Sequence, residues 1–376
     1  MKILIFGNFG NGNNGDEVVL MAMLQEFRQL DPTAQITVIS GNPVQTEKLH
    51  GVQAIRRGFS PEVIRAIAWT DVVIIGGGGI LIDQVHSNLK YGLVILLACI
   101  FRKPIMVYGI GLDTLTGSIT RKSVNLAFNK VNIIALRDKE SREGMRKLGV
   151  SVPIYVTADP AFTLDPPNRE DFREVLIKTG LYEKRSPLIG ISVWPTDNFN
   201  SYQRVLQVFA DLGDSLIANY GWKIVFLVMS TIGFEGDLEG SYRIVEMMKH
   251  RDKAQVLNVN YSPRALMAVF GQMDLVIGMR YHSLVLSAIM NVPMIGIERV
   301  KYPKNTYFLR EVRQPSGGTV GSLTARQLEE CVSTVWRSKK EMAQRVAAAR
   351  KRLRTRAGQN IKLFCQLMAE RTEATK

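Results

Sequence analysis

The strongest constraint on the fold is a repeated alternation between short β-branched runs and longer stretches with helical spacing. In the first half of the chain, expected strands occur at residues 2–7, 35–40, 71–75, 104–110 and 133–136, and helical stretches at 17–30, 91–100 and 141–148. This alternation is typical of βαβ units, in which helices connect parallel strands. We therefore expect an α/β fold that begins with a Rossmann-like domain over residues 1–165.

The alternation is interrupted once and then resumes. The sequence Asp-Pro-Pro at residues 165–167 ends regular structure, because proline lacks an N–H donor and restricts the residue before it. We expect a linker over residues 166–186, a second Rossmann-like domain over 187–322, and a basic C-terminal helical segment over 323–376. Two such domains facing a central cleft, followed by a long helical segment, are similar to the GT-B architecture.

Composition supports a folded protein of two domains. The chain has 376 residues, of which 46% are hydrophobic and 22% charged, and this is the composition of a globular protein. The longest apolar run, residues 92–100, is much shorter than the roughly 18 residues that span a bilayer, and we expect it to be a buried helix. The apolar start at residues 1–7 is too short for a signal peptide and is expected to be a strand.

Cysteine usage points to neither a disulfide framework nor a metal site. Cys99, Cys331 and Cys365 lie far apart and are odd in number, whereas disulfide scaffolds and zinc sites use closely spaced sets. We therefore expect no bound metal and a cytoplasmic protein. Peripheral attachment to the inner face of the cell membrane is compatible with this location.

The charge is strongly positive and partly concentrated near the C-terminus. A net charge of +14 favours an anionic partner. Nine basic residues crowd one segment: Arg337, Lys339, Lys340, Arg345, Arg350, Lys351, Arg352, Arg354 and Arg356. Two interpretations stay open for this segment, namely a solvated helix face and a surface that docks on anionic membrane. Nucleic acid is not expected as a partner, because aromatic residues are not interleaved with the basic ones.

The first candidate site is the loop rich in glycine and asparagine at residues 7–17. Small residues let backbone amides approach a ligand, and Asn14 or Asp16 can cap the helix that follows. The loop is not a P-loop, because no Gly-Lys-Ser/Thr follows. We select Asn11, Gly12, Asn14 and Asp16 as candidate contacts to the acceptor or to a phosphate. A tight strand-to-helix turn is the alternative interpretation.

The second candidate site is the run of four glycines at residues 76–79. The run follows an expected strand directly, and Asp83 and Ser87 come after it at near-helical spacing. We select Gly77, Gly78, Asp83 and Ser87 as further candidate contacts to the acceptor or to a phosphate. Glycines at this position indicate that a ligand or another segment of chain passes close by. A flexible turn is the alternative.

Two further candidates place an arginine at the end of a strand, where open α/β sheets bind ligands. Arg137 can hold a phosphate or carboxylate with two hydrogen bonds, or it can be paired with Asp138 or Glu140. Arg280 and His282 stand two residues apart after another strand. This pair combines an anion clamp with a candidate general acid.

Together these segments resemble the bacterial polysaccharide pyruvyltransferase family, in particular its CsaB-like members that serve S-layer anchoring. The resemblance covers most of residues 1–300. It is carried by Gly12-Asn13-Asn14-Gly15-Asp16-Glu17, Gly76 to Gly79 with Asp83 and Ser87, Gly109-Ile110-Gly111, Arg137-Asp138-Lys139-Glu140-Ser141, Ala158-Asp159-Pro160-Ala161-Phe162 and Gly278-Met279-Arg280-Tyr281-His282.

The resemblance implies a GT-B-like fold and transfer of the pyruvyl group of phosphoenolpyruvate to a sugar diol. The acceptor it implies is often a lipid-linked intermediate of a secondary cell-wall polymer or exopolysaccharide, and neither a metal nor a cofactor is implied. Arg137 would bind the donor from the first domain, while Arg280 and the backbone of Tyr281 would bind it from the second. His282 would be the general acid.

Two segments depart from the family's usual pattern. Trp194 stands where many relatives have arginine, and residues 298–304 replace a segment of the type Tyr-Asp-Pro-Lys. A GT-B glycosyltransferase that uses a nucleotide sugar is the alternative enzyme, because glycine-rich turns serve diphosphates equally well. A binding protein without catalytic activity, attached through its basic C-terminal segment, is the alternative of a different class.

Overall fold

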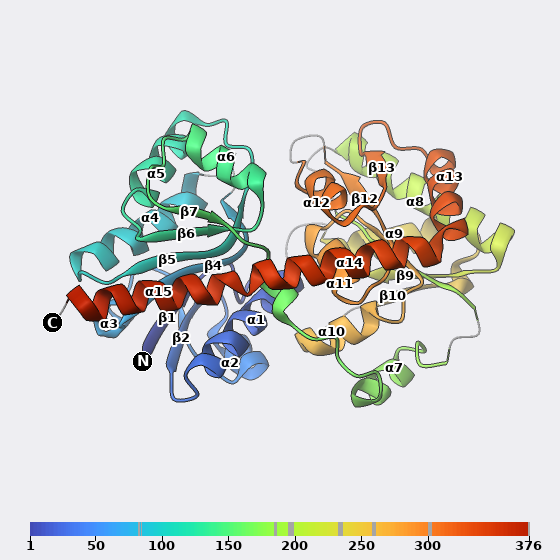
Figure 1. Ribbon diagram of the computed structural model, residues 1–376. Coiled ribbons are helices and arrows are strands. Elements are labelled where there is room, and N and C mark those ends of the chain that lie inside the picture. The colour runs from blue at the N-terminus through green and yellow to red at the C-terminus, as the bar shows by residue number, and fades with distance from the viewer. Residues whose placement is uncertain are drawn as a thin grey trace. The chain divides into compact units, whose positions relative to one another are not determined.

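The computed structural model describes residues 1–81, 83, 85–183, 186–194, 199–231, 236–257, 261–299 and 303–374. The chain forms two compact units (Figure 1). The first consists of Met1–Leu164 together with Arg352–Lys376, and the second of Asp165–Lys351. The boundary near the C-terminus therefore falls inside a helix, α14 (Lys339–Ala357).

The first unit is built on a seven-stranded sheet in the order β3-β2-β1-β4-β5-β6-β7, and every pairing in it is parallel. Its strands are β1 (Lys2–Phe6), β2 (Gln35–Ser40), β3 (Gln53–Arg56), β4 (Val72–Leu81), β5 (Ile105–Leu112), β6 (Ile133–Leu136) and β7 (Ile154–Val156). The central strands are nearly continuous apolar runs because helices cover both faces of the sheet.

The helices of the first unit start at a capping side chain in four cases, and without one at Ser118. They are α1 (Asn14–Leu30), α2 (Pro43–His50), α3 (Pro61–Trp69), α4 (Val85–Ile100), α5 (Ser118–Phe128), α6 (Lys139–Lys147) and α15 (Gln359–Ala374), with a short 3-10 helix at Pro160–Thr163. Ser60 shows the pattern, because its side chain accepts a hydrogen bond from the N–H of Val63 and Pro61 occupies the first turn.

The second unit repeats the architecture with a six-stranded sheet in the order β10-β9-β8-β11-β12-β13, again with parallel pairings throughout. The strands are β8 (Leu188–Ser192), β9 (Lys223–Leu227), β10 (Ala254–Leu257), β11 (Leu275–Gly278), β12 (Met294–Glu298) and β13 (Ser316–Thr319). The helices are α7 (Arg173–Lys178), α8 (Phe199–Tyr220), α9 (Asp237–Met247), α10 (Pro263–Phe270), α11 (Tyr281–Ile289), α12 (Lys304–Val312), α13 (Ala325–Arg337) and α14. The expected α/β class with Rossmann-like units is confirmed.

The C-terminal helical segment is shared between the units. Helix α13 packs on the second unit through Leu328, Val332 and Val335, whereas α15 lies beside β5 and β6 of the first (Figure 1). Asn360 anchors α15, because its amide nitrogen donates to the carbonyl of Ala158 at 3.1 Å. The last 25 residues therefore complete the first unit's core from the far end of the sequence.

Two expectations about the first unit are corrected. Strand β4 does not end at Ile75 but continues through the glycine run to Leu81. Helix α4 is not wholly buried, because Leu93, Leu96 and Ile100 on its outer side are exposed. Within the described ranges, no helix is both long and apolar enough to cross a membrane.

Candidate functional site

Each sheet has a switch point, where the chain connections leave two neighbouring strands in opposite directions. In the second unit this point lies between β8 and β11, and in the first between β1 and β4. Ligands of open α/β sheets bind at the carboxyl ends of such strand pairs. Trp194 follows β8 and Arg280 follows β11, so both stand at the switch point of the second unit.

Arg280 is held by a carboxylate from another strand end. Its Nε and Nη2 atoms donate to both oxygens of Asp237 at 2.5–3.1 Å. Asp237 begins α9 and also accepts hydrogen bonds from the backbone N–H groups of Met229 and Ser230, at 3.3 and 3.0 Å. Burial raises the pKa of the Asp237 carboxyl, while Arg280 and the two N–H groups act in the opposite direction. The guanidinium orientation is thus fixed by a fully hydrogen-bonded partner.

The indole of Trp194 is a platform for three cations. The guanidinium carbons of Arg280 and Arg299 lie 4.3 and 4.2 Å from the ring centre, and Nζ of Lys304 lies 5.5 Å from it. An aromatic face attracts cations and stacks well with guanidinium groups. Residues from both segments that depart from the family's pattern therefore meet at the Trp194 ring, which Arg280 also contacts.

A second acidic residue beside this cluster, in addition to Asp237, is Glu298, the last residue of β12. Its buried carboxylate accepts hydrogen bonds from the backbone N–H groups of Thr306 and Arg299, at 2.8 and 3.1 Å. Burial raises the pKa of Glu298, while the hydrogen bonds and Lys304 act against the shift. With Asp237 and Glu298 ionised, the three cations still leave the cluster positive, and a positive cluster at a strand end suits an anionic ligand.

His282 lies two residues after Arg280, in the first turn of α11. It is buried, and its ring meets the ring of Tyr281 edge to face, with the centres 5.4 Å apart. Arg280 is the residue that precedes the first turn of α11. The N–H groups of a helix's first turn have no partners within the helix and favour anions. Arg280, Tyr281 and His282 therefore bring a guanidinium, backbone donors and an imidazole to one helix end.

Arg137, at the end of β6, is in a different setting. Its side chain is only 2% exposed, and it forms ion pairs with Asp138 and Asp159, each at 3.5 Å. Gly111 makes room for it, since a Cβ there would lie 2.5 Å from the Arg137 Nε. The pairing with Asp138 agrees with the alternative interpretation of this residue. Asp159 was not selected from the sequence, because 22 residues separate the partners.

The loop after β1 is held by its own polar side chains. Asn11 donates to Asn8 at 2.6 Å, and Asn8 donates to the buried Asp16 at 2.7 Å. The expected capping role of Asn14 or Asp16 is wrong, because the side chain of Asn13 caps α1 by accepting from the N–H of Gly15. Asn14 is the first helical residue instead. Gly12 has a φ of +65°, which favours glycine.

Arg57 joins this loop and was not identified from the sequence. Its Nη2 donates to the carbonyls of Gly7 and Phe9, 50 and 48 residues away. Burial lowers the pKa of Arg57, while Tyr91 and Asp16 favour its charged form. A cation, a carboxylate and a phenol thus surround the switch point of the first unit. No local pattern could signal this, because Arg57 follows an edge strand.

The glycine run is explained mainly by packing of the protein itself. A Cβ on Gly76 would lie 2.5 Å from Met23, and one on Gly77 would lie 2.8 Å from Val19. Both neighbours belong to α1, so the segment that passes close by is the protein's own helix. Gly78, like Gly77, has a positive φ, of 81°.

Asp83 stabilises the segment before α5 through hydrogen bonds. It accepts hydrogen bonds from the N–H groups of Thr116 and Gly117, at 3.0 and 3.1 Å, and from the Thr116 hydroxyl. These contacts hold the segment that leads into α5. The side chain of Ser87 lies outside the described part of the chain.

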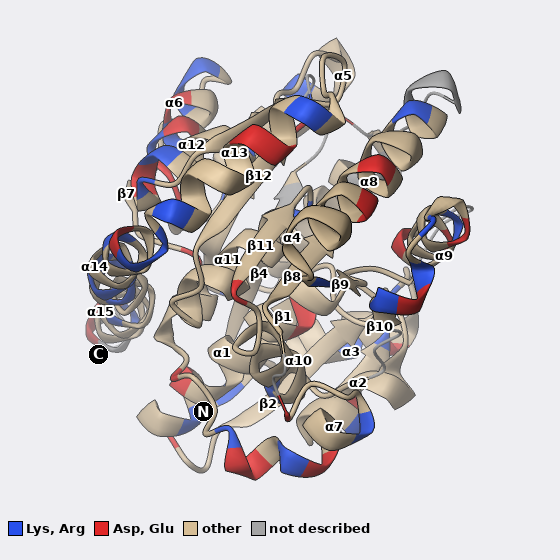
Figure 2. Ribbon diagram, turned by 90° about the vertical axis from the view of Figure 1, so that its right-hand side faces the viewer, with Lys and Arg blue, Asp and Glu red and all other residues tan. Residues whose placement is uncertain are grey.

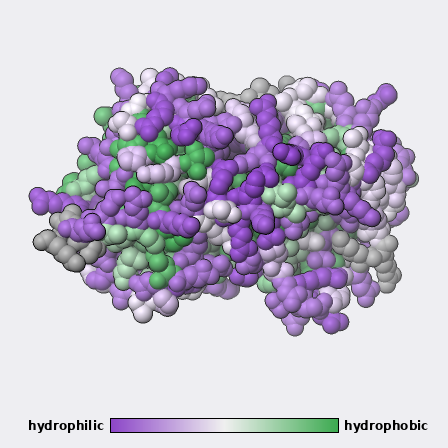
Figure 3. Space-filling view, viewed as in Figure 1, coloured by the Kyte–Doolittle hydropathy of each residue, from purple (hydrophilic) through white to green (hydrophobic). Residues whose placement is uncertain are grey.

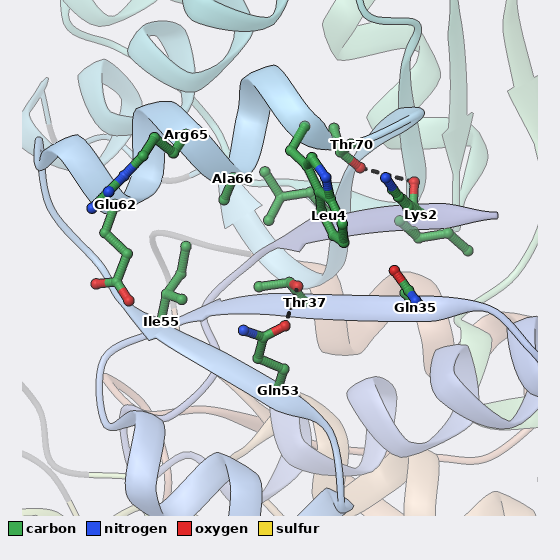
Figure 4. Close-up of a pocket in the computed structure, with 12 residues that line it drawn as sticks. Lys2, Leu4, Gln35, Thr37, Gln53, Ile55, Glu62, Arg65, Ala66 and Thr70 are labelled. Carbon is green, nitrogen blue, oxygen red and sulfur yellow. Dashed lines mark hydrogen bonds between the residues drawn. The ribbon is translucent and has the colours of Figure 1, made fainter.

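A separate cavity of about 290 Å³ lies over β1, β2 and β3 beside α3 (Figure 4). It is lined at one end by Lys2, whose Nζ lies 3.6 Å from the ring centre of Trp69. Figure 4 shows Thr37 and Gln53 joined by a hydrogen bond within it. None of the residues selected from the sequence lines this cavity. Within the described residues, no three His, Cys, Asp or Glu side chains are grouped as metal ligands.

Sequence comparisons point to one family. The family model described as polysaccharide pyruvyl transferase matches residues 13–300. The chain is also 23% identical over 353 residues to the amylovoran biosynthesis protein AmsJ of Erwinia amylovora, covering 79% of this chain and 83% of that protein. The family resemblance found in the motifs is thus confirmed.

Several solved structures share this fold. The UDP-GlcNAc 2-epimerase of Neisseria meningitidis has a TM-score of 0.66 at 10% identity, covering 98% of this chain and all of that one. MnaA of S. aureus, solved with UDP, has a TM-score of 0.65 at 11% identity, with 97% of both chains covered. The E. coli ADP-heptose LPS heptosyltransferase II has a TM-score of 0.52 at 15% identity, covering 90% and 100%. These likenesses confirm the expected GT-B-like fold.

Proposed function

Because the chain belongs to the polysaccharide pyruvyl transferase family, we propose that it transfers the pyruvyl group of phosphoenolpyruvate to a sugar diol. The acceptor is a precursor of an exopolysaccharide or cell-wall polymer, and the product is a cyclic ketal. The observation that carries this proposal is the positive cluster at Arg280, which adjoins His282 on one helix end.

The donor's charge matches the cluster. Phosphoenolpyruvate carries a phosphate and a carboxylate on one carbon, so it needs several cationic or N–H donors. Arg280 binds one anionic group through Nη1, which has no hydrogen-bond partner among the described residues, while Nε and Nη2 stay on Asp237. Arg299 and Lys304, gathered at Trp194, supply further positive charge. The backbone N–H groups at the start of α11 are the remaining hydrogen-bond donors for the anionic groups.

The reaction requires a proton on the methylene carbon of the donor. His282, in its protonated form, gives that proton, and the neighbouring carbon becomes an electrophile that a sugar hydroxyl attacks. The bond between this carbon and the phosphate oxygen then breaks, and the second hydroxyl closes the ketal. Of the two hydroxyl protons released, one balances the proton taken by the methyl group and the other leaves on phosphate. No metal or cofactor takes part in these steps.

In the first unit, we propose Arg137 as a second anion-binding residue. Its ion pairs with Asp138 and Asp159 are at 3.5 Å, the outer limit of a hydrogen bond, so a phosphate or carboxylate can replace either at shorter distance. The polar groups of Asn11 and Asp16 are proposed to contact the acceptor, as hydroxyl groups are bound by amide and carboxylate side chains.

The test is phosphate release from phosphoenolpyruvate in the presence of lipid-linked and nucleotide-linked sugars. Acceptor-dependent release by the parent protein, lost in Arg280→Ala and in His282→Ala, is expected. Arg243→Ala is the matched control, because Arg243 lies on α9 of the same unit and its ion pair with Glu239 is exposed to solvent. Consumption of a nucleotide sugar without phosphoenolpyruvate would replace this proposal with the glycosyltransferase alternative.

A further inference from the structure

Helix α4 of the first unit is apolar on both of its sides. Tyr91, Val94 and Ala98 on one side are buried in the core. The opposite side carries Leu89, Leu93, Leu96 and Ile100, whose side chains are 37–63% exposed. At 100° per residue these four positions fall within an arc of about 60°. They form a continuous stripe, whereas the outer face of a helix on a globular protein is usually polar.

Helix α5 extends this apolar surface. Ile119 and Leu126 are 64% and 67% exposed and lie two turns apart, so they share one face. The two helices pack closely, since a Cβ on Gly92 of α4 would lie 3.7 Å from the Cβ of Ala127 on α5. Phe101, just beyond α4, is also exposed. On the face drawn in Figure 3, hydrophobic residues also gather on the upper part of the first unit.

The charged residues of this region are almost all basic. Between residues 85 and 130 they are Lys90, Arg102, Lys103, Arg121, Lys122 and Lys130, against a single acidic residue, Asp113. Asp113 is buried, while the basic residues are exposed apart from the half-buried Lys103. An apolar stripe bordered by positive charge is the pattern of surfaces that lie in the interface of an anionic membrane.

We propose that the α4–α5 face, meaning the exposed residues of α4, Phe101 and α5, docks on an anionic lipid bilayer. The apolar stripe enters the headgroup region, and the basic residues contact lipid phosphates. Charge complementarity favours a bilayer over a second copy of the chain, because a two-fold contact would bring these basic residues together, and the one nearby acid that is not fully buried, Asp83, is hydrogen-bonded to Thr116 and Gly117. Such a surface would hold the enzyme where lipid-linked sugars are found.

The basic C-terminal segment lacks the apolar part of this pattern. Basic residues recur along α14 (Figure 2), but its apolar residues Val346 and Leu353 face the protein core. Lys339 is paired with Asp274, and Arg356 donates to the carbonyl of Thr157. The α14 surface can attract a membrane only through charge, which salt screens. Membrane attachment is therefore assigned to the α4–α5 face.

The experiment is flotation of the full-length protein with vesicles of phosphatidylglycerol and phosphatidylcholine, compared with phosphatidylcholine alone. The parent should bind only the anionic vesicles. Leu96→Glu combined with Ile100→Glu should weaken binding at least tenfold, because both side chains would have to carry charge into the headgroup region. Val44→Glu with Ile177→Glu is the matched control, since these side chains are 76% and 54% exposed elsewhere.

A second pair of variants separates the two basic surfaces. Lys90→Glu with Lys122→Glu should weaken binding, whereas Arg345→Glu with Lys351→Glu on α14 should bind like the parent. An unchanged thermal midpoint and unchanged phosphate release with a water-soluble acceptor would show that each variant is folded. No binding by the parent, or loss only in the α14 variant, would overturn the proposal. A parent dimer that Leu96→Glu with Ile100→Glu dissociates, without vesicle binding, would make the face a contact between two copies.

Discussion

Arg280 and Asp237, 43 residues apart, meet through three hydrogen bonds of 2.5–3.1 Å between the guanidinium and the carboxylate. Asp237 has no exposed surface, while Arg280 remains 18% exposed. The carboxylate therefore holds the arginine from the buried side, while part of the guanidinium side chain stays exposed. The first prediction depends on this arrangement.

Asp237→Asn should lower kcat/KM for phosphoenolpyruvate about 10- to 100-fold, because a hydrogen bond to a charged group contributes about 1.5–3 kcal/mol. The lower kcat/KM should come mainly from a higher KM if Arg280 binds phosphoenolpyruvate in the ground state. Glu239→Gln on the same helix breaks an exposed ion pair with Arg243 and should change little. If Asp237→Asn and Glu239→Gln had the same kcat/KM, Asp237 would have no role in binding the donor.

Trp194→Leu should raise KM for phosphoenolpyruvate about three- to tenfold, since each cation stacked on an indole gains about 0.5–2 kcal/mol. Trp194→Phe keeps an aromatic face and should lie closer to the parent. The matched control is Trp69→Leu, which removes an indole that contacts Lys2 in the first unit. If Trp194→Phe and Trp194→Leu are equally impaired, the indole acts by packing and not by holding cations.

Gly111→Ala should destabilise the protein by about 1–3 kcal/mol through overpacking and lower activity, because the new Cβ would lie 2.5 Å from Arg137. Gly92→Ala is the control, since its Cβ would meet Ala127 at an ordinary 3.7 Å inside α4. That change should stabilise the helix by about 0.5–1 kcal/mol. Thermal unfolding and phosphate release measure both effects. Normal activity in Gly111→Ala would argue against a role for Arg137 in the reaction.

The buried carboxyl of Glu26 should make stability depend on pH. Burial raises the pKa of Glu26 to about 7, although a hydrogen bond from Tyr108 at 2.8 Å acts against the shift. Between about pH 4.5 and 7 the unfolded chain releases this proton while the folded state keeps it, so stability falls as pH rises, by about 3 kcal/mol in all. Glu26→Gln should remove this decline.

Thermal midpoints at pH 5, 7 and 8.5 test the Glu26 prediction. The gain from Glu26→Gln should be largest at pH 8.5 and smallest at pH 5. Glu62→Gln, at an exposed position of α3, is the control and should follow the parent at each pH. A gain that does not vary with pH would mean that Glu26 is not the group that titrates.

The order of strands and helices was largely readable from the sequence, with limits at the edges of both sheets. Strands such as β1 and β8 are buried apolar runs bounded by turn residues. The edge strands β3, β7 and β13 were missed, because they are short and mostly not buried, so they lack an apolar run. Strand β4 was cut short because glycine lowers the local strand signal, while here α1 packs against the glycines and needs their lack of a side chain.

The sequence by itself determined that Arg137, Arg280 and His282 follow strands of parallel sheets, because hydrophobic periodicity and glycine or proline signals act over a few residues. Only the tertiary structure decided their surroundings. Asp159, after β7, reaches Arg137 because β6 and β7 are neighbours in the first sheet. Asp237, at the start of α9, reaches Arg280 although β8 lies between β9 and β11. The tertiary structure also decided that the α4 stripe is exposed. From its sequence alone, an apolar helix such as α4 can be either buried or exposed. Backbone hydrogen bonding is local, whereas ion pairing and burial depend on which distant segments become neighbours.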